Sequence, residues 1–400
     1  MTNVKPPTNN ALRKIASNAA KDVTMFGIYP TAYRIAARQP VDPRKVLFIE
    51  GKLGPMPDSF ELIWKRIESD PKYDAKYISL GLNEVPLPKY IMNCRNMVKE
   101  LATAKYAFLC DASNIVSCVP LRPETMIVQL WHACGAFKKW GMSTGNKYFG
   151  ATGSEIERHP YYKNLEVVTV SSPEVEWAYR EAMMLENTPE VVQPLGVSRT
   201  DVYFDPEFLA SAKKDVLAAV PGIAGRKVIL YAPTFRGRVL EAVSPDDLDI
   251  RAMKRVLGAD YALLVKHHPY VKRPTPIPED CTDFAFTVDL PIDKLITTAD
   301  VCISDYSSLV FEYSLFERPM SFFAPDLSDY DDWRGFYYDY EDLTPGPVFE
   351  QTQPLIDWIC QLDNGFDPSE IRAFRQKFMS SCDGHATERI LQWVGIGIEE

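Results

Sequence analysis

The chain has 400 residues, of which 46% are hydrophobic and 24% charged, so it can form two or three globular domains and is not a disordered protein. Its 44 basic and 54 acidic residues give a net charge of -10, which argues against a dedicated nucleic-acid partner. No apolar run approaches the roughly 18 residues of a membrane span, and the polar start with two prolines is unlike a secretory signal. We therefore expect a protein that is not exported by that route.

A basic, partly amphipathic stretch at residues 10–38 comes first along the chain. It intersperses apolar side chains such as Ile15, Phe26 and Tyr33 with basic ones. Such a stretch can lie on an anionic membrane surface, or it can be a helix that packs on its own domain and keeps its charges in water. The sequence leaves both interpretations open. The basic residues are Arg13, Lys14, Lys21, Arg34 and Arg38.

Short apolar runs of strand length then alternate with segments that have the spacing of amphipathic helices, clearest at residues 59–67, 173–183 and 308–316. This alternation predicts parallel sheets built from βαβ units. The fold class is therefore α/β, with two doubly wound, Rossmann-like domains that face a cleft. The expected strands are residues 45–50, 76–80, 106–110, 125–130 and 167–171 in the first half, and residues 227–232, 262–266, 284–288, 301–304 and 320–323 in the second.

The segment between the two series is rich in proline and glycine and precedes a helical pattern at residues 206–219. Because both residue types interrupt regular structure, a hinge near residue 195 is predicted. We expect an amino-terminal domain of residues 1–195 and a carboxy-terminal domain of residues 196–400. The carboxyl ends of both sets of strands would then face the cleft, where ligands bind in such folds.

Only five histidines occur, and His132 has the most suggestive position among them. It directly follows the predicted strand at residues 125–130 and precedes a turn that contains Gly135. An imidazole at a strand's carboxyl end can take a proton from a substrate hydroxyl near neutral pH, and a structural histidine is the alternative. Cys134 could be a nucleophile, but nothing else indicates an activated thiolate, so we interpret it as small packing at a tight turn.

The second half also places cationic and hydroxyl groups at strand ends. Arg236, His268 and the pair Ser307-Ser308 each follow a predicted strand, and the serines begin a helical pattern. A diphosphate needs several fixed donors, so their convergence at one sheet edge predicts a diphosphate site, although ordinary helix capping also explains the serines. Glu312 on the same helix could accept hydrogen bonds from ribose hydroxyls or could face solvent.

The absence of two sequence motifs argues against two classes of enzyme. The sequence has neither the glycine-rich P-loop of nucleotide triphosphatases nor the GxGxxG fingerprint of dinucleotide-dependent oxidoreductases. The acidic stretch at residues 326–332 is more typical of a loop than of a metal site, and eight scattered cysteines without a CxxC pair indicate reduced thiols rather than structural zinc. No cofactor is predicted, and a metal requirement cannot be read from the sequence.

In their order along the chain, six motifs resemble those of the CDP-glycerol:polyol glycerophosphotransferase family, the teichoic-acid primases and polymerases, over most of residues 40–395. The resemblance implies a glycosyltransferase-B type fold and a cytosolic enzyme that works at the inner membrane face. It also implies that residues 1–195 form the acceptor-side domain and residues 196–400 the CDP-polyol-binding domain. Ala133-Cys134-Gly135 stands where the family more often has Gly-Thr-Pro, which bears on acceptor or polyol preference. The motifs are Gln129-Leu130-Trp131-His132, Tyr231-Ala232-Pro233-Thr234-Phe235-Arg236, His268-Pro269, Ser304-Asp305-Tyr306-Ser307-Ser308, Arg334-Gly335-Phe336-Tyr337 and Pro345-Gly346-Pro347.

The resemblance also implies residue roles. His132 matches the histidine proposed as catalytic base, His268 matches the histidine that contacts the donor phosphate, and Arg236 with Ser307-Ser308 matches the diphosphate-binding groups. The leading hypothesis is transfer of glycerol phosphate or ribitol phosphate from CDP-glycerol or CDP-ribitol to a hydroxyl of a lipid-linked saccharide, with release of CMP. Positioning and charge stabilisation would supply most of the rate.

Two other functions are compatible with the same residues. One is a nucleotide-sugar glycosyltransferase of the same fold, and the other is a non-catalytic protein that binds a nucleotide or a membrane. The acceptor, the choice of glycerol or ribitol, the number of units added and the oligomeric state are not encoded in any pattern that we recognise.

Overall fold

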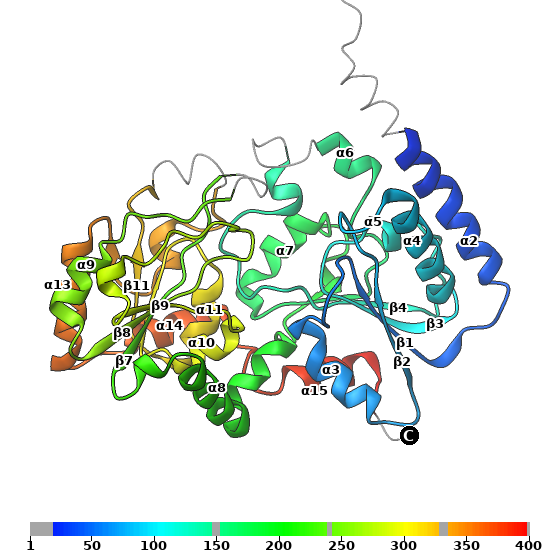
Figure 1. Ribbon diagram of the computed structural model, residues 1–400. Helices are drawn as coiled ribbons and strands as arrows, with labels where there is room; N and C mark the ends of the chain where they lie inside the picture. The colour runs from blue at the N-terminus through cyan, green and yellow to red at the C-terminus, as the bar shows by residue number, and fades with distance from the viewer. Residues whose placement is uncertain (1–18, 146–152, 238–241, 328–334, 398–400) are drawn as a thin grey trace, which may run out of the picture.

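The computed structural model describes residues 19–145, 153–237, 242–327 and 335–397, and it contains two parallel six-stranded sheets that lie side by side (Figure 1). The strand order is β2-β1-β3-β4-β5-β6 in the first sheet and β12-β11-β10-β7-β8-β9 in the second. In both sheets the order reverses next to the first strand of the series, which is the arrangement of a doubly wound fold. The predicted α/β class is therefore confirmed.

Every strand predicted from the sequence is present, with ends that differ by a few residues. Strands β6 and β12 were not predicted, because two residues are too few to form a recognisable apolar run. The strands are β1 (Asp42–Glu50), β2 (Asp74–Ser79), β3 (Ala104–Leu109), β4 (Met126–Gln129), β5 (Val167–Thr169), β6 (Val192–Gln193), β7 (Lys227–Tyr231), β8 (Tyr261–Val265), β9 (Ala285–Thr287), β10 (Val301–Ser304), β11 (Met320–Phe323) and β12 (Val348–Phe349).

Every predicted helical segment contains a helix, although two of them divide. The segment 173–183 begins with a 3-10 turn at Pro173–Val175, and the segment 308–316 divides into α11 and a 3-10 turn at Ser314–Phe316. In the first half the helices are η1 (Val23–Ile28, a π-helix), α2 (Tyr29–Ala36), α3 (Asp58–Glu68), α4 (Leu87–Leu101), α5 (Asn114–Ser117), α6 (Gly153–Arg158) and α7 (Glu176–Met183). In the second half they are α8 (Pro206–Ala219), α9 (Ile250–Leu257), α10 (Ile292–Thr298), α11 (Leu309–Tyr313), α13 (Thr352–Gln361), α14 (Ser369–Phe378) and α15 (Ala386–Val394).

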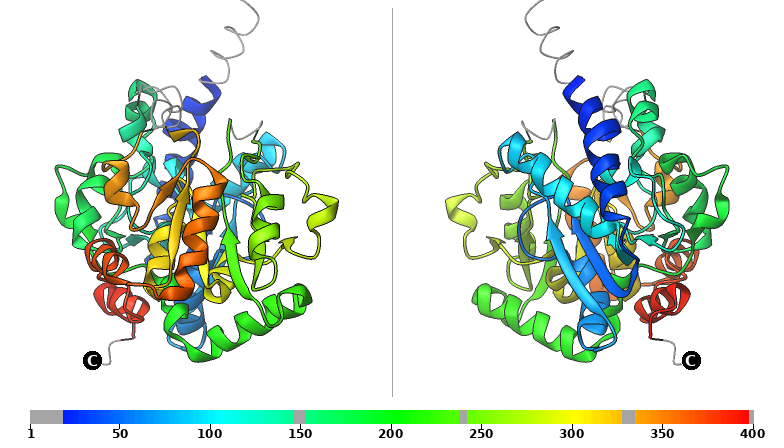
Figure 2. Two further views of the ribbon diagram at one scale, coloured as in Figure 1. Left: turned by 90° about the vertical axis from the view of Figure 1, so that its left-hand side faces the viewer. Right: turned by 90° about the vertical axis from the view of Figure 1, so that its right-hand side faces the viewer.

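Both faces of each sheet are buried, which explains why the strands read as continuous apolar runs. In β1, Val46 and Phe48 pack with α3 and α15 on one face, whereas Leu47 and Ile49 join the core on the other. The side views show helices on both sides of the strands (Figure 2). Full burial of each such side chain stabilises the fold by about 1.5–3 kcal/mol.

The two halves are joined by more than the connection near residue 195. Helix α15, near the end of the chain, packs against the first sheet through Ile390, Leu391 and Val394 and lies beside α3 (Figure 1). Gly196 has φ +90°, and a Cβ there would lie 2.2 Å from the carbonyl oxygen of Ser381. The boundary at residue 195 stays a prediction, and we propose that α15 be counted with the first domain.

The described part of the basic stretch forms η1 and α2, and residues 10–18 lie outside the described residues. Tyr29 and Tyr33 are buried, and α2 packs on α4 along the outer side of the first sheet (Figure 2). The outward face exposes Val23, Phe26 and Ile35, each by more than half of its surface. The packed-helix interpretation therefore holds for the inner face. No helix in the described ranges is long and apolar enough to cross a membrane.

Candidate active site

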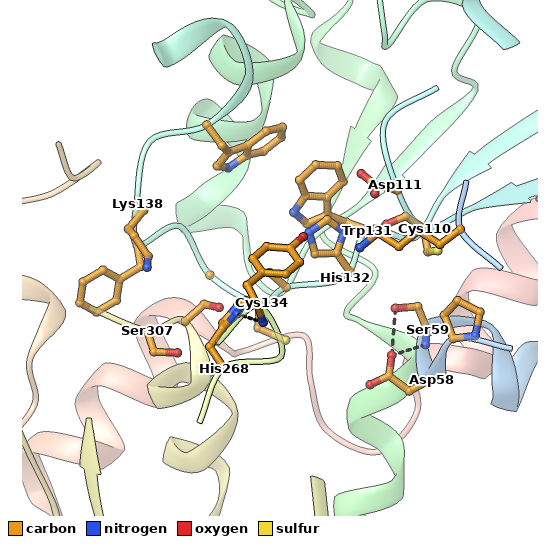
Figure 3. Close-up of a pocket in the computed structure, with 18 of the residues that line it drawn as sticks. Asp58, Ser59, Cys110, Asp111, Trp131, His132, Cys134, Lys138, His268 and Ser307 are labelled. Atoms are coloured by element: carbon orange, nitrogen blue, oxygen red, sulfur yellow. Dashed lines mark hydrogen bonds between the residues drawn. The ribbon is translucent and has the colours of Figure 1, made fainter. Parts of the chain in front are cut away.

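A pocket of about 740 Å³ opens where the strand order reverses in both sheets (Figure 3). On the first-domain wall, Glu50 is the last residue of β1 and Asp111 follows β3. On the second-domain wall, Thr234 follows β7 and Ser307 follows β10. These are the two topological switch points, where the loops of neighbouring strands diverge and leave a crevice. The pocket therefore lies where the fold class predicts a ligand.

His132 lies on the first-domain wall of this pocket (Figure 3). Its Nδ1 is 2.8 Å from the carbonyl oxygen of Cys110, the residue that follows β3. A carbonyl oxygen only accepts hydrogen bonds, so we infer that Nδ1 carries the proton and that Nε2 keeps a lone pair in the neutral ring. The ring is exposed and stacks on Trp131, with ring centroids 4.3 Å apart. This arrangement suits a general base.

The turn that carries His132 is held at several points. Trp131 has φ +58°, a conformation that a bulky residue adopts only when its surroundings impose it. The hydroxyl of Tyr179 donates to the carbonyl oxygens of Ala133 and Gly135, both at 3.2 Å. Cys134 is buried within the turn, and burial raises the pKa of its thiol, which supports the packing role rather than that of a nucleophile.

The second-domain wall presents hydrogen-bond donors. The backbone N–H of Tyr270 donates to Nδ1 of His268 at 3.2 Å, so in the neutral ring the proton lies on Nε2. Phe235 and Tyr270 flank the imidazole, each with a centroid 4.8 Å away. Ser307 and Ser308 also line the pocket, and the Ser307 hydroxyl accepts a hydrogen bond from the N–H of Leu309.

Arg236 is not among the residues that line this pocket, and its guanidinium is shared between two carboxylates. Its Nη1 is 3.0 Å from Oδ2 of Asp305, and its Nε and Nη2 bind both oxygens of Asp326. Despite burial, the hydrogen bonds and charges of Asp326 and Asp305 raise the pKa of Arg236. Asp305 also accepts from the backbone N–H and hydroxyl of Thr234. These contacts tie Arg236 to the segments behind the pocket wall, and its role in binding a diphosphate stays a prediction.

Glu312 is only 2% exposed, so the solvent-facing alternative is wrong, and it is not among the residues that line the pocket. Its contact with a ribose stays a prediction. One carboxylate oxygen pairs with Arg199, and the other accepts a hydrogen bond from the hydroxyl of Tyr203 at 2.8 Å. Burial raises the pKa of Glu312, although the charge of Arg199 opposes that shift. Arg199 also binds Asp58 at 3.1 Å and so links helix α11 to helix α3 across the two domains.

The Arg334–Tyr337 motif connects the domains as well, although Arg334 itself lies outside the described residues. The N–H of Lys139 donates to the carbonyl of Gly335 at 3.0 Å, and the N–H of Tyr337 donates to the carbonyl of Phe137 at 3.1 Å. This short antiparallel pairing fixes the segment after the His132 turn against the second domain.

Several wall residues were missed by sequence reasoning. Glu50 is the last residue of one predicted strand and Asp111 follows another, so the sequence could have indicated both by their position at the carboxyl end of a strand. Lys52 faces the second domain, and its Nζ lies 5.6 Å from the ring centroid of Tyr270. Although burial opposes it, the charges of Tyr270, Asp111 and Glu50 raise the pKa of Lys52. Nothing in the sequence indicated that Tyr270 would meet Lys52.

The described residues hold no group of three or more histidine, cysteine, aspartate or glutamate side chains suited to a metal ion. Most of the acidic stretch 326–332 lies outside them, and only Asp326 and Leu327 are described. All eight cysteines are free thiols.

The sequence matches the CDP-Glycerol:Poly(glycerophosphate) glycerophosphotransferase family over residues 31–395. It is 32% identical to the teichoic acid ribitol-phosphate primase of Bacillus spizizenii, over 92% of this chain and 95% of that protein. It is 26% identical to the teichoic acid glycerol-phosphate primase of Bacillus subtilis, over 82% and 81%. The solved structure of the wall teichoic acid polymerase TagF has a TM-score of 0.71 at 20% identity and covers 98% of both chains, which shows the shared glycosyltransferase-B type fold.

Proposed function

Because this chain belongs to the CDP-Glycerol:Poly(glycerophosphate) glycerophosphotransferase family and is a polyol phosphotransferase, we propose that it transfers glycerol phosphate or ribitol phosphate from a CDP-polyol to a lipid-linked saccharide in teichoic acid synthesis. An acceptor hydroxyl would attack the polyol-bearing phosphorus, the bond to the CMP phosphate would break, and CMP would leave. The hydroxyl proton would pass to Nε2 of His132. Relatives that act on each polyol support either donor.

The hydrogen bond from His132 to the Cys110 carbonyl carries this proposal. It holds the exposed imidazole on the first-domain wall with Nε2 available as the acceptor of a proton. A general base contributes typically 10²–10⁴-fold to a rate. The remaining acceleration would come from orienting the two substrates and from donors around the transferring phosphoryl group.

The second-domain wall is suited to bind the diphosphate of a CDP-polyol. His268, Ser307 and Ser308 offer imidazole N–H and hydroxyl donors, and among the described lining residues of the second domain there is no carboxylate. All three lining carboxylates, Glu50, Asp58 and Asp111, belong to the first domain. An anionic diphosphate is therefore favoured on the second-domain wall, and a hydroxyl-rich acceptor on the first.

Access to a lipid-linked acceptor would come from peripheral binding at the inner face of the cell membrane. The outward face of η1 and α2 combines the exposed Val23, Phe26 and Ile35 with Arg34 and Arg38. Each basic residue near an anionic surface contributes about 1 kcal/mol, and the apolar side chains add burial. Co-sedimentation with anionic vesicles should decrease in a Val23→Ser/Phe26→Ser/Ile35→Ser variant, and equal sedimentation would contradict this route.

A product assay tests the reaction itself. The protein is incubated with CDP-glycerol or CDP-ribitol and a lipid-linked saccharide, and mass spectrometry follows both the nucleotide and the lipid. Release of CMP together with an acceptor heavier by one polyol phosphate supports the proposal. Release of UDP from a UDP-sugar would instead identify a glycosyltransferase, and binding of CDP-polyol without turnover would identify a binding protein.

A further inference from the structure

The last residue of strand β4, Gln129, has a side chain that is completely buried beneath the pocket wall. Its amide nitrogen donates to the carbonyl oxygen of Asp111 at 3.0 Å. Its amide oxygen accepts from the backbone N–H of Trp131 at 3.1 Å. Both ends of the amide group are therefore engaged by backbone atoms at the ends of two neighbouring strands.

These contacts continue the sheet beyond its last backbone hydrogen bond. The paired residues of β3 and β4 end at Leu109 and Gln129, and the N–H of Leu130 still donates to the carbonyl of Leu109 at 2.8 Å. Past that point two side-chain contacts link the strand ends, namely the Gln129 amide to Asp111 and the His132 ring to Cys110. Both reach adjacent residues of the segment that follows β3.

The same amide holds the strained backbone of Trp131. This residue has φ +58° and its N–H points to the Gln129 amide oxygen. Its indole stacks on the rings of His132 and Trp140, with centroids 4.3 and 4.4 Å away. Since a bulky residue leaves this conformation when it is not held, the direction of His132 depends on the Gln129 contact.

We infer that Gln129 is a positioning residue that fixes the orientation and the tautomer of His132, by holding the Trp131 turn at a set distance from the Cys110-Asp111 segment. The catalytic consequence rests on the proposed function, in which His132 is the base. The tautomer itself does not, because it follows from the hydrogen bonds alone. Without this amide, the Nδ1 contact to Cys110 loosens and the ring reverts to the Nε2–H form that free neutral histidine favours. That form has no lone pair on Nε2.

The test compares the full-length protein with Gln129→Met, which keeps the length of the side chain and removes both hydrogen bonds. Gln129→Glu is a second variant, because its carboxylate accepts from the Trp131 N–H but repels the carbonyl oxygen of Asp111 and cannot donate to it. The matched control is Gln193→Met, at the end of strand β6 in the same sheet, whose amide makes one local hydrogen bond to Glu190. ¹⁵N-histidine NMR, assigned with His132→Ala, reports the tautomer of each protein.

We expect the wild type and Gln193→Met to show the Nδ1–H form of His132, and Gln129→Met to shift toward Nε2–H. With a CDP-polyol and a lipid-linked acceptor, kcat should fall by about 10- to 100-fold in Gln129→Met, while KM for the CDP-polyol stays within about twofold. Gln129→Glu should shift the tautomer and lower kcat in the same direction as Gln129→Met, because it also loses the hydrogen bond to Asp111. An unchanged tautomer in both folded Gln129 variants would overturn the inference. Full turnover in His132→Ala would instead refute the proposed base and leave the tautomer result valid.

Discussion

The two histidines of the pocket, one on each wall, carry their protons on opposite ring nitrogens. His132 donates from Nδ1 to the carbonyl of Cys110, whereas His268 accepts at Nδ1 from the N–H of Tyr270. The first ring therefore offers a lone pair at Nε2 and the second offers an N–H there. The backbone group beside Nδ1 thus decides whether Nε2 of the neutral ring can accept a proton or donate a hydrogen bond.

Replacing His132 should give the largest effect. We expect His132→Ala and His132→Gln to lower kcat by roughly 10²- to 10⁴-fold, because neither side chain can accept the acceptor's proton at that position. KM for the CDP-polyol should change little, since the donor is assigned to the opposite wall. The measurement is steady-state release of CMP.

His385→Ala is the control for that series, because His385 is exposed at the start of α15 and does not line the pocket. Near wild-type turnover in a folded His132→Gln variant would contradict the role of His132 as the base, and with it the difference in role between the two histidines.

Arg236→Ala tests whether the second-domain wall depends on a buried ion pair. Its removal leaves Asp305, which is 1% exposed, without its cation, and loss of one partner of a buried pair typically costs about 3–5 kcal/mol. The expected result is a large decrease in the free energy of unfolding, measured by urea denaturation. A variant with normal stability and lost affinity for CDP-polyol would return Arg236 to the role of a direct ligand.

Two substitutions of His268 test whether its ring donates a hydrogen bond to the CDP-polyol. Glutamine keeps an amide N–H near the place of Nε2, so His268→Gln should retain more donor affinity than His268→Ala, for which we expect a loss of about 10-fold. At position 132, in contrast, glutamine should restore no turnover relative to alanine. Calorimetry with CDP-glycerol and CDP-ribitol measures the affinities, and equal losses for both His268 variants would argue against an N–H donor.

Gly135→Ala should give the smallest effect. Gly135 lies where the turn of the first domain contacts helix α11 of the second domain. Gly135 has φ +62°, and a Cβ there would lie 2.4 Å from the ring of Phe311. We expect the substitution to lower the free energy of unfolding by about 1–3 kcal/mol. Gly225→Ala separates backbone strain from collision, because Gly225 also has a positive φ, +76°, but no atom lies within 4 Å of its Cβ position. Equal decreases in the free energy of unfolding for the two variants would show that the collision with Phe311 does not contribute.

Chain order and apolar periodicity were sufficient to predict the strands. They also predicted that the residues after each strand lie at the carboxyl edge of its sheet. That is why His132, His268, Ser307 and Ser308, each placed after a predicted strand, all line one pocket in the structure. Parallel strands that alternate with helices end at the same edge of a sheet, so position along the sequence translates directly into position in space.

The partners of the polar side chains were decided only by the tertiary structure. Arg236 meets Asp326, 90 positions along the chain, and Glu312 meets Arg199, 113 positions away, and neither partner could be read from the local sequence. Whether a strand-end side chain faces a ligand or a counter-ion depends on what other segments bring beside it. Periodicity determines which residues reach the crevice, but burial and charge pairing between remote segments determine which of them remain available there.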